Sequence, residues 1–390
     1  MELMSTNWNF PTTIWFGAGR INDLPLSCQK IGIKKPLLVT DNGLVKLDIV
    51  ENAQRILKEA GIDFTTYSNV QGNPTEANVL NGVAHYNNNG HDGVIAFGGG
   101  SAIDAAKTIA FMSGQSRSLW DFEDVGDNWT HANIAGIAPI IAIPTTAGTG
   151  SEVGRASVIL DEKLQSKKII FHPKMLPGIV IIDPELTIGL PAHITAWTGV
   201  DAMVHAIEAY CAPGYHPMAD GIAIEAIRII AKYLPRAFKD GSDLEARGQM
   251  LVAAAMGATA FQKGLGSVHS VAHQLGAIYN KAHGLLNAII LPYALQQNKS
   301  VIEERMVYLS KVLALPNHGT DAIITYIVEL RSALKIPHTL KEIGINDDEA
   351  NRIGKMAFND PSTPTNAKPV SADDLEKLFR AAVKGELTSL

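Results

Sequence analysis

Short β-rich runs alternate with amphipathic helical patterns through the first half of the chain, and this alternation is the feature that most constrains its fold. Four stretches are typical of strands bounded by turn residues: KKPLLVTD (34–41), DFTTYSNV (63–70), DGVIAFGGG (92–100) and IAPIIAIPTT (137–146). Between them, apolar residues recur at helical spacing, as in VENAQRILKEAGI (50–62). The alternation predicts a parallel sheet that is covered by helices on both faces.

The second half of the chain has a different pattern. The β signals end after IVIIDPELTIGLP (179–191), and from Ala192 onward we expect successive helices rich in Ala, Ile and Leu. Helix breaks are predicted at PGYHP (213–217) and LPNHG (315–319). A loop is predicted at PSTPTNAKPVS (361–371), before a last short helix.

With 390 residues the chain is long for one hydrophobic core, so two domains are expected. We place an α/β domain at residues 1–187 and an all-helical domain at residues 188–390. Ligands in such architectures bind at the carboxyl ends of strands and between domains. We therefore expect the functional site in the interdomain cleft.

The composition excludes several classes of protein. Apolar residues make up 46% of the chain and charged residues 18%, which is typical of a well-packed enzyme and not of a disordered chain. The net charge of −6 gives no electrostatic reason to bind nucleic acid or an anionic membrane. No secretion signal or membrane-spanning run is recognisable. With only two cysteines, we expect a cytoplasmic protein without a disulfide.

The stretch HDGVIAFGGGSAIDAAKTIAF (91–111) has the pattern of strand, glycine loop and helix. Gly98, Gly99 and Gly100 would let backbone N–H groups approach a ligand closely, and the helix that opens at Ser101 would favour a pyrophosphate. The alternative is a plain strand-to-helix turn, with Ser101 as the N-cap and Asp104 completing a capping box. The glycines do not follow the GxGxxG pattern and leave both interpretations open.

Asp41 ends an early strand, where dinucleotide-binding folds place a carboxylate against the ribose 2′-hydroxyl. A carboxylate there would repel a 2′-phosphate, which favours NAD over NADP. The alternative is an Asx turn with Asn42 and Gly43.

A second candidate nucleotide loop is PTTAGTGSE (144–152), which follows a buried strand. Its threonines Thr145, Thr146 and Thr149 could line a nucleotide with hydroxyl groups. It could equally be an ordinary connection between elements.

Histidines and a carboxylate recur at helical spacing in two stretches of the second half. Asp201 and His205 are four residues apart in GVDAMVHAIEAY, and His269 and His273 repeat that spacing in GSVHSVAHQLGAIYNKAHGLL, which also holds His283. Residues four apart lie on the same face of a helix, so each pair offers two ready metal ligands. A single histidine in such a helix is usually part of the core. The repeated spacing favours one metal site built from both stretches.

His283 lies just past a predicted helix break at YNKAH (279–283). Gly284 is the residue expected to let the chain turn there.

The chain resembles the iron-containing (group III) alcohol dehydrogenases, a family that includes lactaldehyde reductase, 1,3-propanediol dehydrogenase and iron-activated ethanol dehydrogenases. The likeness runs nearly from end to end. It is carried by WFGAGR (15–20), VTDNGLV (39–45), GGGSAIDAAK (98–107), IPTTAGTGSEV (143–153), IDPELT (182–187), TGVDAMVHAIEAY (198–210) and HSVAHQLGAIYNKAHG (269–284).

The resemblance implies a Rossmann-like domain, an all-helical domain of the dehydroquinate synthase-like architecture, and a role for each matched residue. It implies that the metal ligands are Asp201, His205, His269 and His283. His273 would line the active site near the nicotinamide without binding metal. The expected cofactor-binding residues are Asp41, Gly98, Gly99, Gly100, Ser101, Asp104, Thr145, Thr146, Thr149 and Lys167, with Lys168 as the alternative register.

The implied activity is oxidation of a small primary or secondary alcohol, or the reverse reduction of an aldehyde, with NAD as the cofactor. A divalent ion would stabilise the alkoxide, and hydride would pass from the substrate carbon to the nicotinamide. His273 is expected to relay the alcohol proton. Three imidazoles and a carboxylate suit Fe(II), Zn(II) or Mn(II); the family favours iron, with zinc as the main rival.

Three other functions remain open at this point. A hydroxyacid–oxoacid transhydrogenase of the same family would recycle bound cofactor between two substrates. A dehydroquinate synthase-like lyase would share the architecture, and a non-catalytic nucleotide-binding protein would use the metal structurally. We also expect a homodimer, for which the Ala- and Ile-rich helical faces at 222–231 and 250–261 offer surfaces.

Overall fold

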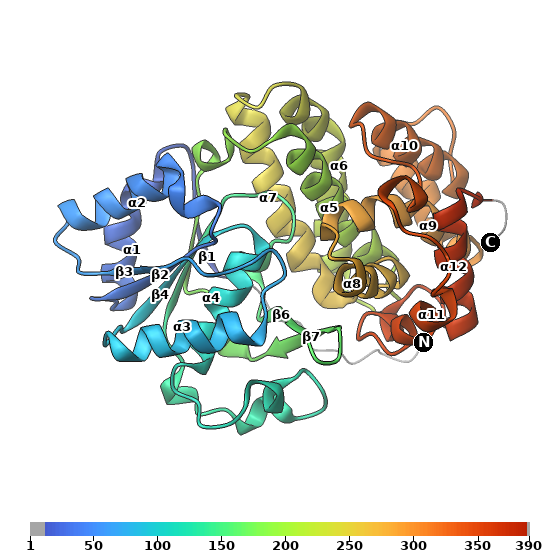
Figure 1. Cartoon of the computed structure of the whole chain (residues 1–390). Coiled ribbons are helices and arrows are strands. Elements are labelled where there is room, and N and C mark those ends of the chain that lie inside the picture. The colour runs from blue at the N-terminus through green and yellow to red at the C-terminus, as the bar shows by residue number, and fades with distance from the viewer. Residues whose placement is uncertain (1–11, 388–390) are drawn as a thin grey trace. The chain divides into compact units, whose positions relative to one another are not determined.

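The computed structural model describes residues 12–387, which form two compact units over residues 12–190 and 191–387 (Figure 1). The first unit contains the strands, and the second is helical. The predicted fold class, a parallel α/β region followed by an all-helical one, is confirmed. Among residues 12–387, no helix combines the length and the apolar character needed to cross a bilayer.

The first unit is built on one six-stranded sheet, in which all neighbouring strands are parallel. The predicted strands are present and are shorter than their sequence runs, because each run includes the turn that follows it. The strands, in spatial order, are β1 (Thr13–Phe16), β8 (Ile179–Ile182), β5 (Ile140–Pro144), β4 (Gly93–Gly98), β2 (Pro36–Val39) and β3 (Thr65–Tyr67).

Helices cover both faces of this sheet (Figure 1). On one face, the helices α1 (Leu24–Ile31) and α2 (Asp48–Glu59) form a core with alternate residues of the central strands, such as Phe97 and Ile141. The helices α3 (Glu76–Asn88) and α4 (Gly100–Met112) pack together, and α4 packs against β4 and β5. The central strands are buried on both sides, which explains why their sequences are continuously apolar.

Two features of the first unit were not predicted. The edge strand β1 pairs with β8, and a separate antiparallel hairpin is formed by β6 (Ala156–Asp161) and β7 (Ser166–Phe171). The hairpin turn contains Gln165 with a φ of 49°. β1 has no buried residue, and β6 and β7 mix buried with partly buried residues, so these strands lack the continuous burial of the central strands.

The second unit contains eight α-helices within residues 191–387. Their boundaries agree with the breaks predicted at 213–217 and 315–319 and with the loop before the last helix. The helices are α5 (Ala192–Cys211), α6 (Pro217–Lys239), α7 (Leu244–Ala260), α8 (Ser267–Tyr279), α9 (His283–Val312), α10 (Thr320–Ala333), α11 (Ala350–Phe358) and α12 (Ala372–Lys384).

The Ala- and Ile-rich segments 222–231 and 250–261 lie on α6 and α7, which pack against each other and against α5. Residues such as Ala223, Ile230 and Leu251 are fully buried there. Many of their apolar side chains therefore form part of the core of the helical unit, and the homodimer stays a prediction.

Candidate metal centre and nucleotide loops

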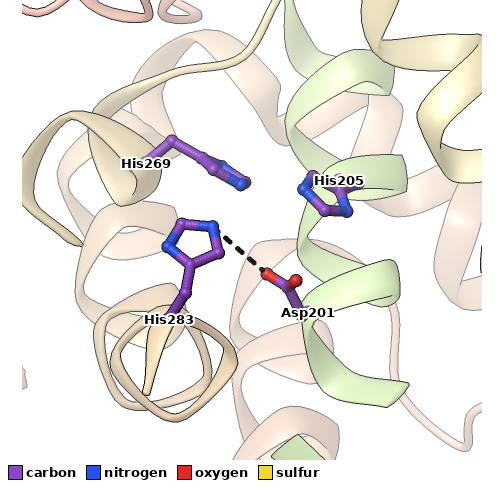
Figure 2. Close-up of side chains that lie close together, drawn as sticks. All are labelled: Asp201, His205, His269 and His283. Atoms are coloured by element: carbon purple, nitrogen blue, oxygen red, sulfur yellow. Dashed lines mark ion pairs between the residues drawn. The ribbon is translucent and has the colours of Figure 1, made fainter. Parts of the chain in front are cut away.

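Four side chains from three helices converge within the helical unit (Figure 2). Asp201 and His205 project from α5, His269 from α8, and His283 is the first residue of α9. One potential ligand atom from each residue lies within 4.8 Å of all the others. Figure 2 shows the three imidazoles and the carboxylate facing a common point. The two histidine-bearing stretches therefore do come together.

Helix α5 positions the first two of these residues in the centre of the unit. Every residue from Gly199 to Tyr210 is buried, so Asp201 and His205 are both shielded from solvent. They are four residues apart and share one face of the helix. Because burying an unpaired carboxylate is costly, Asp201 needs a cationic or hydrogen-bonding partner at this place.

The chain turn before His283 differs from the prediction. The left-handed residue that ends α8 is Asn280, with a φ of 49°, and Gly284 lies inside α9. A Cβ atom on Gly284 would come within 2.5 Å of the carbonyl oxygen of Trp197 on α5. Gly284 therefore allows α5 and α9 to approach closely, which brings His283 to Asp201: their Nε2 and Oδ1 atoms are 3.8 Å apart.

Asn287, one turn beyond His283 on α9, points its amide nitrogen into this cluster. Its Nδ2 atom lies 2.6 Å from Oδ1 of Asp201, 3.1 Å from Nε2 of His269 and 3.0 Å from Nε2 of His283. An amide has two hydrogens and cannot donate to three acceptors at once. At most two of these three contacts are therefore hydrogen bonds from Asn287, and three imidazoles with one carboxylate are a ligand set that fits a divalent cation.

Glu208, also on α5, contacts the cluster from the side. Its Oε2 atom lies 2.6 Å from Nδ1 of His269, and its Oε1 atom accepts the backbone N–H of Val268 at 2.8 Å. The pKa of His269 lies above its ordinary value: burial acts to lower it, and the hydrogen bond and charge of Glu208, with the charges of Asp201 and Asp360, more than offset that effect. Sequence reasoning missed this residue.

His273 lies beside the four-residue cluster and outside it. Its ring is stacked near that of His283, with centroids 5.3 Å apart, and its Nδ1 atom lies 3.0 Å from Oδ2 of Asp360. The same carboxylate oxygen accepts a hydrogen bond from Gln274 at 3.0 Å. Since an ionised carboxylate only accepts, Nδ1 of His273 carries the proton in this pair and Nε2 is left as a base.

The segment 361–366 belongs to the predicted loop at 361–371 and contacts the beginning of α8. Thr363 donates to the hydroxyl of Ser270 at 2.7 Å, and the Oδ1 atom of Asn366 accepts the backbone N–H of Ser267 at 3.1 Å. The segment therefore forms hydrogen bonds with the first turns of α8, the helix that carries His269 and His273.

In the first unit, the glycine loop (residues 98–100) and the loop at residues 144–152, here called the threonine loop, lie against each other. Gly98 has a φ of 148°, and a Cβ atom there would come within 2.8 Å of the Cβ of Ala102. A Cβ atom on Gly99 would lie 3.3 Å from the hydroxyl of Thr146, and one on Gly100 would lie 2.5 Å from the Cγ2 of Thr149. The missing side chains therefore make room for the threonine loop at the start of α4.

Thr145 adds a hydrogen bond between the threonine loop and the glycine loop. Its backbone N–H donates to the carbonyl of Gly98 at 3.0 Å. Its hydroxyl is buried and has no hydrogen-bond partner among residues 12–387. A buried polar atom without a partner is uncommon and is consistent with a ligand contact.

The capping-box alternative for Ser101 and Asp104 is wrong. The N-cap of α4 is Gly99, with no side-chain cap, and the hydroxyl of Ser101 donates to the carbonyl of Gly72 at 2.7 Å. The carboxylate of Asp104 accepts hydrogen bonds from the hydroxyl of Ser151 at 2.5 Å and from the backbone N–H of Val158 at 3.0 Å. Asp104 therefore connects α4 to the end of the threonine loop and to β6.

Lys107, one turn beyond Asp104, reinforces this connection. Its ammonium group is fully buried and donates to the carbonyls of Ser151 at 2.9 Å and Ala156 at 2.5 Å. Burial is the main reason that the pKa of Lys107 lies below its ordinary value. Lys107 had no role in either interpretation of residues 91–111, as a pyrophosphate-binding loop or as a plain strand-to-helix turn.

For Asp41 the two sequence interpretations are compatible. One carboxylate oxygen, Oδ1, accepts the backbone N–H groups of Gly43 at 2.8 Å and Leu44 at 2.9 Å, which is the Asx turn. The other, Oδ2, lies 3.8 Å from the Cβ position of Gly98 and accepts no hydrogen bond from the described part of the chain. The turn thus fixes the carboxylate and leaves one oxygen facing the glycine loop.

The two lysines of β7 differ in their partners. Lys168 forms an ion pair with Glu123, with 3.0 Å between Nζ and Oε2, and lies over the ring of Trp120. Successive residues of a strand point to opposite faces, so Lys167 is directed away from that ion pair. Whether Lys167 or Lys168 contacts the cofactor stays a prediction.

Comparison with known proteins places this arrangement in one family. Residues 11–184 match the family described as iron-containing alcohol dehydrogenase, and residues 195–383 match the C-terminal region of the Fe-containing alcohol dehydrogenase family. The chain therefore belongs to the iron-containing alcohol dehydrogenase family, and it is an oxidoreductase that acts on alcohols.

Individual relatives match over almost their whole length. The chain is 38% identical to a 4-hydroxybutyrate dehydrogenase of Cupriavidus necator, over 95% of this chain and 98% of the relative. It is 32% identical to an NAD-dependent methanol dehydrogenase of Bacillus methanolicus, over 97% and 100%. A crystal structure of a 1,3-propanediol oxidoreductase superposes with a TM-score of 0.92 at 33% identity, covering 97% of this chain and 100% of that one.

Proposed function

We propose that the protein is a metal-dependent, NAD(H)-linked dehydrogenase of small alcohols, which also reduces the corresponding aldehydes. The observation that carries this proposal is the buried convergence of Asp201, His205, His269 and His283 within 4.8 Å. Three imidazoles and one carboxylate fit a divalent first-row ion. We propose Fe(II) from the family, with Zn(II) as the rival.

Each group has a defined task in this proposal. When bound, the ion supplies Lewis acidity toward the substrate oxygen and the nicotinamide supplies the hydride acceptor. Asp201 contributes the negative charge of the ligand set, and the three imidazoles hold the ion by neutral nitrogen atoms. Gly98, Gly99, Gly100, Ser101, Asp104, Thr145, Thr146, Thr149 and Lys167 are the residues that we propose for binding or shaping the nucleotide site.

The direct test of the proposed function is an activity panel. Anaerobically purified protein is assayed for NADH oxidation with short aldehydes, and for NAD reduction with methanol, 1,3-propanediol and 4-hydroxybutyrate, with and without added Fe(II). We expect NADH-dependent turnover of at least one aldehyde that increases with Fe(II). Exchange between a hydroxyacid and an oxoacid without added NAD would instead identify a transhydrogenase. Failure of every substrate in the metal-loaded protein would contradict the proposal.

Preference for NAD over NADP is expected to depend on Asp41. Asp41→Asn keeps an oxygen that can accept the N–H groups of Gly43 and Leu44, so the turn is preserved while the negative charge is removed. Loss of a charged hydrogen bond to the ribose is expected to raise the KM for NAD about tenfold. Turnover with NADP should rise, because the repulsion of the 2′-phosphate is gone. An unchanged ratio of kcat/KM for the two cofactors would show that Asp41 does not select between them.

We propose that His273 accepts the alcohol proton at Nε2, since its Nδ1 proton is held by Asp360. His273→Ala is expected to lower kcat by about 100-fold, the lower end of what a positioned general base contributes. It is also expected to change the shape of the pH–rate profile, while metal content stays as in the wild type. Wild-type kcat together with a wild-type pH profile would exclude this role.

A further inference from the structure

Glu208 is a buried carboxylate that connects α5 to the beginning of α8. It is 8% exposed, and its two oxygens accept from two different donors on α8, the backbone N–H of Val268 and Nδ1 of His269. The first N–H groups of a helix have no partner inside the helix. One carboxylate therefore satisfies the start of α8 and contacts its first histidine.

The surroundings of Glu208 leave little freedom for another arrangement. A Cβ atom on Gly266 would lie 2.9 Å from Oε1 of Glu208 and 2.7 Å from Oδ1 of Asn366. The two side chains therefore flank the same turn of backbone. Asn366 accepts the N–H of Ser267, the neighbour of Val268, and is not bonded to His269. Among residues 12–387, Glu208 and Asn366 both accept backbone N–H groups at the start of α8, and Glu208 also accepts from His269.

The contact with Glu208 determines which nitrogen of His269 can bind a cation. An ionised carboxylate has no proton to donate, so Nδ1 of His269 must carry the hydrogen in the 2.6 Å contact. In the neutral imidazole, Nε2 then keeps its lone pair. Nε2 is the atom that faces Asn287 and the other cluster residues.

We propose that Glu208 is a positioning residue that fixes the tautomer of His269 and so keeps Nε2 available to the metal. This inference rests on the proposed function, because it assigns His269 as a ligand. Partners of this kind commonly orient metal-binding histidines, and removing one typically weakens metal affinity about 10- to 100-fold.

Glutamine cannot replace Glu208 in this role, although it has nearly the same shape. Its single carbonyl oxygen can accept from Val268 or from His269, and its NH₂ group then faces the other donor. If the oxygen serves Val268, the NH₂ group donates to Nδ1 and forces the hydrogen onto Nε2. Aspartate is shorter and is still an acceptor only. The proposal therefore predicts that Glu208→Asp binds metal more tightly than Glu208→Gln, whereas a role in packing alone predicts the reverse.

The test uses Co(II) as the probe, because its visible absorption reports on the ligands and its affinity can be measured against a competing chelator. Wild type, Glu208→Gln, Glu208→Asp, His269→Ala and Asn366→Ala are compared as full-length proteins, with circular dichroism and thermal unfolding of each metal-free form. We expect Glu208→Gln to bind Co(II) about 10- to 100-fold more weakly and with an altered spectrum. Asn366→Ala removes a helix-start acceptor together with the hydrogen bonds of Asn366 to Asn298 and to the carbonyl of Lys368, but no contact with His269. It should lower the unfolding temperature and keep the wild-type affinity and spectrum.

The outcomes separate this inference from the proposed metal centre. If His269→Ala binds Co(II) as tightly as the wild type, the proposed centre itself is wrong. If His269→Ala loses affinity while Glu208→Gln keeps the wild-type affinity and spectrum, the role of Glu208 is overturned. Equal losses in Glu208→Gln and Asn366→Ala would assign Glu208 to the helix start alone. If Glu208→Gln does not fold, the test uses Glu208→Asp instead. The proposal would be contradicted if folded Glu208→Asp bound Co(II) as weakly as His269→Ala.

Discussion

Asp201→Asn and His205→Ala are each expected to release the metal ion and to lower turnover by about 1,000-fold or more. A Lewis-acidic ion contributes several kcal/mol to the transition state, and each 1.4 kcal/mol corresponds to a factor of ten. Asparagine has nearly the same shape as aspartate, so Asp201→Asn should leave the packing of α5 intact. Metal content per chain and kcat, measured on the same samples, check this expectation.

His318→Ala is the matched control for the histidine variant. His318 is exposed, lies between α9 and α10 in the same unit, and its Nδ1 atom is 3.4 Å from the hydroxyl oxygen of Ser310. It should keep wild-type metal content and turnover. If Asp201→Asn or His205→Ala retained both as well, the converging side chains would not be the metal ligands.

Gly284→Ala is expected to separate α9 from α5 and thereby weaken the metal centre. The new Cβ would lie 2.5 Å from the carbonyl oxygen and 2.9 Å from the carbonyl carbon of Trp197, which are backbone atoms that cannot turn aside. Overpacking of this kind costs about 1–3 kcal/mol. His283, the neighbouring residue, would move relative to Asp201, so metal affinity should fall together with the free energy of unfolding.

Gly221→Ala provides the control, because it makes the same change in α6 where nothing lies within 4 Å of the new Cβ. Alanine is favoured over glycine inside a helix by about 1 kcal/mol, so this variant should be more stable than the wild type. The difference between the two variants isolates the contact with Trp197. Equal stabilities and metal affinities for both would mean that the close approach of α5 and α9 does not hold the site together.

The sequence was most informative where a segment is buried on all sides. The central strands β2, β4 and β5 and the helices of the second unit were predicted because their apolar residues are continuous or follow the helical period. The edge strand β1 and the hairpin of β6 and β7 were missed, since half-exposed short strands have no such pattern. Gly284 was misassigned because a glycine that ends a helix and one that permits close packing look the same in a sequence.

For the site, helical spacing identified the residues that converge but not the residues that orient them. The four-residue spacing identified Asp201 and His205, and the related helical spacings reach Glu208, three residues after His205, and Asn287, four residues after His283. Asp360 carried no such signal, because its contact with His273 is formed between segments 87 residues apart. The domain boundary at 187, the location of the site in the interdomain cleft, the cytoplasmic location and the homodimer remain predictions.

The most direct test of the central claim is the metal content of anaerobically purified protein, measured beside its aldehyde-dependent NADH oxidation. Samples are compared as purified, after removal of metal by a chelator, and after reloading with Fe(II). We expect one ion per chain, loss of activity with loss of the ion while the circular dichroism spectrum is retained, and recovery with Fe(II). Full activity in metal-free, folded protein would contradict the account.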